Sequence, residues 1–142
     1  FYKSSLQEAE ESLRSVCAEK ENVVFMNRTS VLVEGVRFLG CTLWSYIPEE
    51  HKREVQGHMS DYRRIKSQEA ERVQERNLTV DDTVALHKGD VQWLKESIGA
   101  AKAAGERVVV LTHHSPVLYR GCGNPRAWLR PVVHGFGTDL RE

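Results

Sequence analysis

The sequence lacks several features that would assign it to a class of protein at once. Its 142 residues contain three cysteines, an odd number with no C-x-x-C pair, which argues against a disulfide framework or a structural zinc knuckle. Lys plus Arg and Asp plus Glu both number 20, so no excess charge favours nucleic acid. No apolar run approaches the roughly 20 residues of a membrane span, and the first residues are not a signal peptide. We therefore expect a protein of a reducing compartment, the cytoplasm, with neither a nucleic-acid nor a membrane partner.

The composition that remains is that of one ordinary globular domain. Hydrophobic residues make up 40% and charged residues 28% of the chain, as in proteins that bury a single core. The chain opens with Phe1 rather than Met and closes on GFGTDLRE, where no element is evident. We therefore expect the sequence to be an excerpt of a longer protein.

Two helices are predicted from capping signals and apolar spacing. Ser5 and Glu8 have the form of a capping box, in which each side chain satisfies a free backbone N–H, and this predicts a helix over residues 5–20. Thr79 and Asp82 form a second such signature, and the apolar stripe behind it predicts a long helix over residues 80–104. Gly89 lies inside this helix and permits a bend there.

Strands are predicted between and after these helices. Residues 22–26 are expected to form a short strand, and residues 29–44 a β-hairpin that turns at Glu34 and Gly35. Residues 107–112 are β-branched and apolar without alternation, which predicts a strand covered on both faces. A helix followed by a buried strand is half of an α/β layer unit, so we expect an α/β fold with functional residues at the carboxyl end of that strand.

Residues 48–78 interrupt these patterns. The segment is charged and carries little periodicity apart from a short helical pattern near residues 68–75. We expect an exposed excursion that is ordered in part through Met59, Tyr62 and Ile65, because long excursions from compact domains are usually functional or mobile.

The run RVVVLTHHSPVL contains the main candidate for chemistry. His113 and His114 follow the predicted strand directly, and neutral imidazole is the commonest protein ligand for Zn, Fe and Mn. The sheet would hold such a ring in the fixed position that a metal ion requires, and Pro116 stiffens the turn. The competing interpretation is that both are ordinary loop histidines.

The sequence VVVLTHHSP resembles the fourth motif of the calcineurin-like metallophosphoesterases, in which a strand delivers a metal-binding His in an H-x-P context. NVVFM, VLVEGVRFLGCTLW, DYRRI, LTVDDTVALHKGDVQWL and GFGTDL are similar, in the same order, to segments of one branch of that superfamily. The likeness covers nearly the whole chain. It implies that residues 1–142 are one partial domain lying between the Gly-Asn-His-Glu and Gly-His-x-His motifs, with residues 48–78 as its excursion. The implied fold is a partial αββα sandwich with a mixed sheet, incomplete at both ends.

The resemblance also implies an activity, the hydrolysis of small-molecule phosphate mono- or diesters by a metal-activated hydroxide. Two divalent or trivalent ions (Mn, Fe or Zn) would lower the pKa of a bridging water. In the H-x-P register His114 is the metal ligand and His113 a catalytic neighbour, although the register leaves open a shift by one residue. Arg120 and Asn124, in the following loop, are candidate substrate-binding residues. With a single ligand recognisable, the isolated chain is expected to be inactive.

Other polar and aromatic side chains have weaker functional signals. His134 and Asp139 lie in a stretch that the family shares, and either a direct role or an ordering role is open. Loop packing is the competing interpretation for the residues that follow the strand ends, which are Trp44, Tyr46, Tyr119 and Arg126. We interpret the remaining histidines as surface or helix-face residues: His51, His58 and His87.

Two rival functions remain. The first is a non-catalytic α/β module that uses the same scaffold for binding or for packing against another domain. The second is a serine hydrolase using Ser115, which is disfavoured because there is no G-x-S-x-G elbow and Pro116 would spoil the turn.

Overall fold

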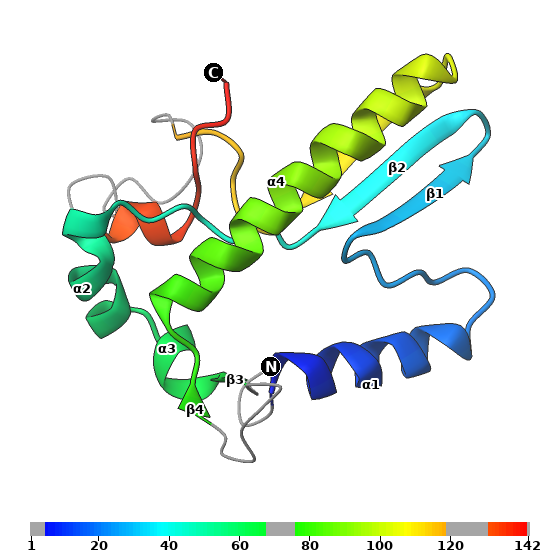
Figure 1. Cartoon of the computed structure of the whole chain (residues 1–142). Helices are drawn as coiled ribbons and strands as arrows, with labels where there is room; N and C mark the ends of the chain where they lie inside the picture. The colour runs from blue at the N-terminus through cyan, green and yellow to red at the C-terminus, as the bar shows by residue number, and fades with distance from the viewer. Residues whose placement is uncertain (1–4, 68–75, 119–130, 142) are drawn as a thin grey trace.

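A computed structural model describes residues 5–67, 76–118 and 131–141 of the chain. The fold is α/β, as expected, and is built on a three-stranded mixed sheet with strand order β1-β2-β5. The helix α4 (Val80–Ala103) lies against β2 and β5, and α1 (Leu6–Ala18) lies away from the sheet beyond a long connecting segment (Figure 1). The smaller elements α2 and α3 gather around the amino-terminal end of α4.

Both predicted helix starts are confirmed. The hydroxyl of Ser5 accepts a hydrogen bond from the Glu8 amide at 3.1 Å, and the Glu8 carboxylate accepts one from the Ser5 amide at 2.9 Å. Thr79 and Asp82 form the equivalent reciprocal pair at the start of α4. These side chains satisfy backbone donors that have no partner within the helix, which explains where the helices begin.

The predicted hairpin is also confirmed. β1 (Thr29–Val33) runs antiparallel to β2 (Val36–Cys41), and the two turn residues Glu34 and Gly35 have φ of 48° and 76°. Positive φ at both positions matches the twist of the flanking strands. β5 (Arg107–Thr112) pairs in parallel with β2, so α4 is the crossover helix that connects them.

One face of the sheet packs against α4 and the other is open. The buried side chains of the first face form a cluster of Leu39, Cys41, Leu43 and Leu94. On the opposite face Val109 and Leu111 are 38% and 48% exposed. The prediction that residues 107–112 are covered on both faces is therefore wrong for the described structure, because a run without polar alternation indicates apolarity but does not supply the layer that would cover it.

The described part of residues 48–78 is more regular than the exposed, partly ordered excursion that we expected. This segment forms α2 (Glu49–His58), α3 (Asp61–Arg64), β3 (Lys66–Ser67) and β4 (Arg76–Asn77). It supplies a second core, in which Ile65 is 2% and Leu78 1% exposed. Met59, Tyr62 and Ile65 belong to this core, as expected, where they pack with Val80 and Val84 of α4. The helical pattern near residues 68–75 lies outside the described residues.

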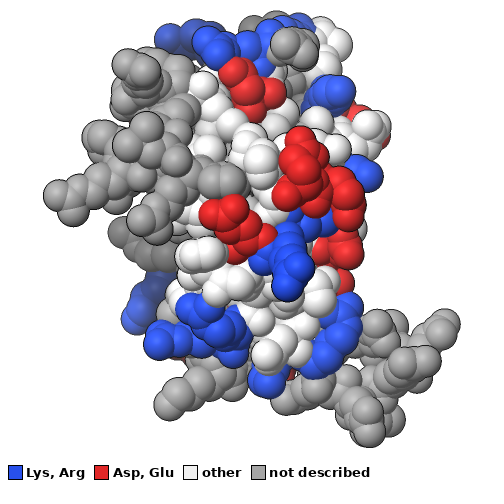
Figure 2. Space-filling view, turned by 90° about the vertical axis from the view of Figure 1, so that its left-hand side faces the viewer, with Lys and Arg blue, Asp and Glu red and all other residues white. Residues whose placement is uncertain are grey.

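The strand predicted over residues 22–26 is not formed. Val23 and Val24 are 47% and 51% exposed. The described sheet contains β1, β2 and β5, and none of these strands pairs with residues 22–26. No described helix has the length and apolarity that crossing a membrane requires. Acidic and basic side chains are interspersed on the face shown in Figure 2, as expected from equal numbers of each.

Candidate functional site

The histidine pair lies where the parallel strands β2 and β5 end. Their carboxyl ends meet at one edge of the sheet, and the segments that follow are joined there by backbone hydrogen bonds. The His114 amide donates to the Thr42 carbonyl at 3.0 Å, and the Ser115 amide donates to the Phe136 carbonyl at 3.0 Å. The edge therefore assembles three loops that are far apart in sequence, residues 42–47, 113–118 and 134–138.

His114 points into the protein at this edge. It is 8% exposed, and its Nδ1 lies 3.0 Å from the hydroxyl oxygen of Ser45, which is itself 2% exposed. The Trp44 ring lies beside it with a centroid separation of 5.2 Å. The imidazole is thus held by the Ser45 contact and by aromatic packing.

Burial lowers the pKa of His114 to about 4, and the neighbouring His113 ring adds to this effect. Asp61 and the Gly135 backbone act in the opposite direction without overcoming burial. The ring is therefore neutral at pH 7, and a neutral imidazole is the form that binds a metal ion.

His113 differs from its neighbour in being exposed. Its ring meets that of His114 nearly edge-on, with centroids 5.3 Å apart and planes at 82°. The structure therefore brings one buried and one solvent-accessible imidazole to the same edge of the sheet.

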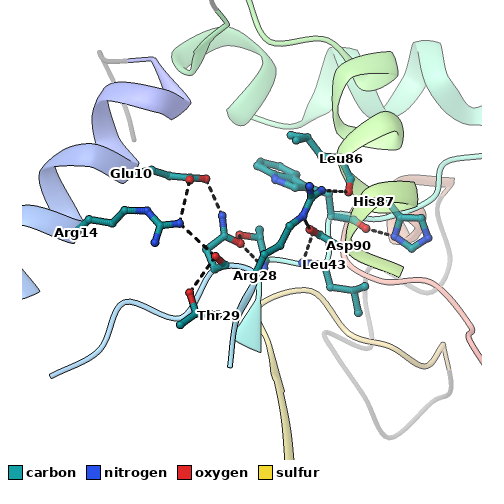
Figure 3. Close-up of polar contacts among 11 residues, drawn as sticks. Glu10, Arg14, Arg28, Thr29, Leu43, Leu86, His87 and Asp90 are labelled. Atoms are coloured by element: carbon teal, nitrogen blue, oxygen red, sulfur yellow. Dashed lines mark hydrogen bonds and ion pairs between the residues drawn. The ribbon is translucent and has the colours of Figure 1, made fainter. Parts of the chain in front are cut away.

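Loop 42–45 is also held by side chains from the segment before β1 and from α4. The Asn27 side-chain oxygen accepts from the Thr42 amide at 3.0 Å, and Asp90 Oδ2 accepts from the Leu43 amide at 2.9 Å. His87 Nδ1 donates to the Trp44 carbonyl. Figure 3 shows these contacts converging on the loop from α4 and from the segment before β1.

The Arg28 side chain completes this arrangement. Arg28 Nε donates to Asp90 Oδ1 at 2.7 Å, and Arg28 Nη2 donates to the Leu86 carbonyl at 3.1 Å. Asp90 is 3% exposed, and the guanidinium provides the charge partner that a buried carboxylate requires. Gly89 makes room for it, since a Cβ there would lie 2.4 Å from Arg28 Nη2.

The other predicted site residues fall in different places. Ser115 forms a local turn, in which its hydroxyl donates to the Val117 carbonyl at 2.7 Å, so it is not paired with a histidine as a nucleophile would be. His134 stacks on His51 at 4.7 Å and thus orders the packing of the 3-10 helix η2 (Pro131–Gly135) on α2. Asp139 binds Arg141. The positions predicted in the loop after the strand lie outside the described residues: Tyr119, Arg120, Asn124 and Arg126.

Ser45, Asn27 and Asp90 were missed by the sequence analysis. His87, expected on the surface or on a helix face, is buried on the inner face of α4 and is 5% exposed. No local signal identifies such residues, because the contacts join positions such as Ser45 and His114 that are 69 residues apart.

The described residues do not form a metal centre by themselves. Within residues 5–67, 76–118 and 131–141, no three His, Cys, Asp or Glu side chains are grouped so that they would hold an ion. His114 supplies one suitable donor, and any further donors would have to come from outside this part of the chain.

A cavity of about 590 Å³ lies between α1 and α4. Its wall includes Glu10, Arg28, Trp44 and Asp90, but neither of the paired histidines. It therefore borders the loop that supports His114 without opening onto the ring itself.

Comparisons with known proteins assign no activity to the chain. No family model matches it, and no solved structure matches it. Uncharacterized protein L509 of Acanthamoeba polyphaga mimivirus is 26% identical over 113 residues, which cover 80% of this chain and 39% of that protein. The chain thus spans less than half the length of this relative.

Proposed function

We propose that the chain forms one section of a metal-dependent phosphoesterase domain of the calcineurin-like type and contributes its fourth-motif histidine. The observation that carries the proposal is the buried, neutral imidazole of His114 at the carboxyl end of a parallel strand, in an H-x-P context. The finer architecture, a metallophosphoesterase-type sandwich in which this mixed sheet is one layer, belongs to the same proposal.

The open face of the sheet supports this architecture. Val109, Leu111 and Val33 share that face and are 38%, 48% and 50% exposed. A second layer packed on it would bury these side chains, as both faces of a sheet containing parallel strands usually are. In the proposed domain that layer comes from residues outside the described part of the chain.

The two histidines have different roles in this proposal. His114 is held by Ser45 and keeps a neutral ring, so it binds a cation without having to release a proton first. His113 is exposed at the same edge and contacts the phosphoryl group of the substrate. Arg120 and Asn124, which lie outside the described residues, are proposed as further substrate contacts. The metal pair, Mn, Fe or Zn, would supply an activated hydroxide when bound.

The decisive experiment uses a polypeptide that contains this sequence together with the flanking motifs. We expect close to two equivalents of transition metal and hydrolysis of p-nitrophenyl phosphate or its diester. His114→Ala should lose about one equivalent of metal and most of the turnover. The control is His58→Ala, which changes an exposed histidine on α2.

The alternative function is a non-catalytic module of the same fold. A polypeptide that folds fully but binds no transition metal would reject the phosphoesterase and leave this alternative.

A further inference from the structure

We propose that Ser45 is a positioning residue for His114, and that Asn27, His87 and Asp90 form a clamp that holds Ser45 against the ring. The clamp is defined by these three side chains and their contacts to residues 42–44. This inference rests on the proposed function, because a positioned ring matters most when His114 binds a ligand.

The clamp fixes consecutive residues of the loop. Asn27 binds both the amide and the hydroxyl of Thr42, at 3.0 and 3.1 Å, and Asp90 binds the next amide, that of Leu43. His87 binds the carbonyl of Trp44. On the far side of Ser45, the Tyr46 amide donates to the Thr138 hydroxyl at 2.7 Å. The backbone around Ser45 therefore has hardly any freedom to move.

The loop conformation shows why such a clamp is needed. Leu43 has φ of 50°, the left-handed region that a branched side chain avoids. A residue in this region persists only where its surroundings over-determine it, and the Asp90 carboxylate provides that constraint. Without it, the loop would relax and move the Ser45 hydroxyl away from His114.

The contact itself distinguishes the two ring nitrogens. Ser45 engages Nδ1, so Nε2 is the ring nitrogen that the Ser45 hydroxyl does not contact. In the tautomer that would bind a metal through Nε2, Nδ1 carries the proton and donates it to the Ser45 hydroxyl, and supporting groups of this kind orient the histidines of metal sites. Ser45 itself is unsuited to be a nucleophile, because it is 2% exposed.

The test is nitrogen-15 NMR of the histidine rings in the metal-free chain at neutral pH. We expect His114 to give signals of a single neutral tautomer, and Ser45→Ala to give averaged signals of two tautomers. Ser45→Thr should restore the single tautomer, because it keeps the hydroxyl. Ser115→Ala, which removes the adjacent hydroxyl that bonds only Val117 among the described contacts, should change nothing.

The clamp is tested by Asp90→Asn, which should shift the His114 signals partway toward those of Ser45→Ala. Unaltered His114 signals in Ser45→Ala would overturn the inference. If Ser45→Ala does not fold, the test uses the unmodified chain. A slowly exchanging proton, shared between the Ser45 hydroxyl and the His114 ring, supports the contact. The absence of that proton overturns it.

The two proposals fail separately. If the tautomer depends on Ser45 but the longer polypeptide binds no metal, the phosphoesterase proposal fails and the positioning contact stands. If metal is bound through His114 while Ser45→Ala leaves the ring signals unchanged, only the positioning role fails.

Discussion

At the scale of single residues, Gly89 and Gly99 occupy the same helix in different surroundings. A Cβ at Gly89 would lie 2.4 Å from Arg28 Nη2, whereas a Cβ at Gly99 would meet nothing within 4 Å. Alanine is favoured over glycine in a helix interior by about 1 kcal/mol. The interior glycine that permitted a bend in the sequence analysis therefore has a packing reason: it admits the guanidinium that neutralises Asp90.

This difference gives the first prediction. Gly99→Ala should raise the free energy of unfolding by about 0.5–1 kcal/mol. Gly89→Ala should be neutral or destabilising, because it displaces Arg28 from a carboxylate that is 3% exposed. Urea unfolding at pH 7 measures both.

A double-mutant cycle separates the displacement of Arg28 from the helix propensity of alanine. In an Arg28→Ala background the obstruction is gone, and Gly89→Ala should become stabilising by an amount close to that of Gly99→Ala. Equal effects of the two glycine substitutions in the unmodified chain would contradict the proposed packing role.

At the scale of elements, the start of α4 depends on Asp82. Hydrogen bonds from Arg76 are the largest cause that lowers the pKa of Asp82 to about 2, and hydrogen bonds from Thr79 add to them. Because the folded-state pKa lies below the unfolded value, this carboxylate stabilises the fold at neutral pH. Its contribution is lost as the pH falls from about 4 to about 2.

We therefore predict that Asp82→Asn lowers the free energy of unfolding by about 1–2 kcal/mol at pH 7 and has little effect near pH 2. The matched control is Asp81→Asn in the same turn. Asp81 is 77% exposed where it pairs with Lys52, so solvent screens that pair and its loss should be small at every pH. A pH-independent effect at position 82 would mean that the ionised carboxylate is not what stabilises the helix start.

Local signals explain which elements were predictable from sequence. The capping boxes and the turn at Glu34 and Gly35 depend on residues within four positions of one another, so their chemistry is readable in the sequence. The strand expected at residues 22–26 failed because a strand requires a partner, and no described strand pairs with this segment. The burial of Leu78 was not predicted, since it depends on packing against distant residues rather than on a periodic pattern, whereas Ile65 is buried as expected.

The candidate site likewise combines a residue with a local sequence signal and residues that depend on long-range contacts. The place of His114 just after the end of β5 was predictable because an apolar strand pattern precedes it. Ser45 and Asp90 were not, because their contacts with His114 and Leu43 span 69 and 47 residues of sequence. Long-range hydrogen bonds of this kind leave no periodic trace in a single sequence.

At the scale of the whole molecule, the sheet has an apolar face that the described helices leave open. Val33, Val109 and Leu111 lie on it, and β5 is an edge strand whose second side pairs with no described strand. Exposed apolar faces next to a free strand edge promote association between chains.

We predict that the 142-residue chain self-associates at micromolar concentration and that a Val109→Lys, Leu111→Lys double variant is substantially more monomeric. Sedimentation velocity measures the shift. Leu140→Lys is the control, because Leu140 is also exposed, at 36%, but belongs to the carboxyl-terminal segment rather than to the sheet. An equal effect of the control would show that added charge, and not the sheet face, governs the association.

The packing of Trp44 on His114 gives the chain an optical reporter. We expect the Trp44 emission to fall when the His114 ring, whose centroid lies 5.2 Å away, gains a proton, and to recover when the proton leaves. With Trp93 and Trp128 replaced by Phe, the fluorescence of Trp44 would report the protonation of His114 during a pH titration, without any added dye.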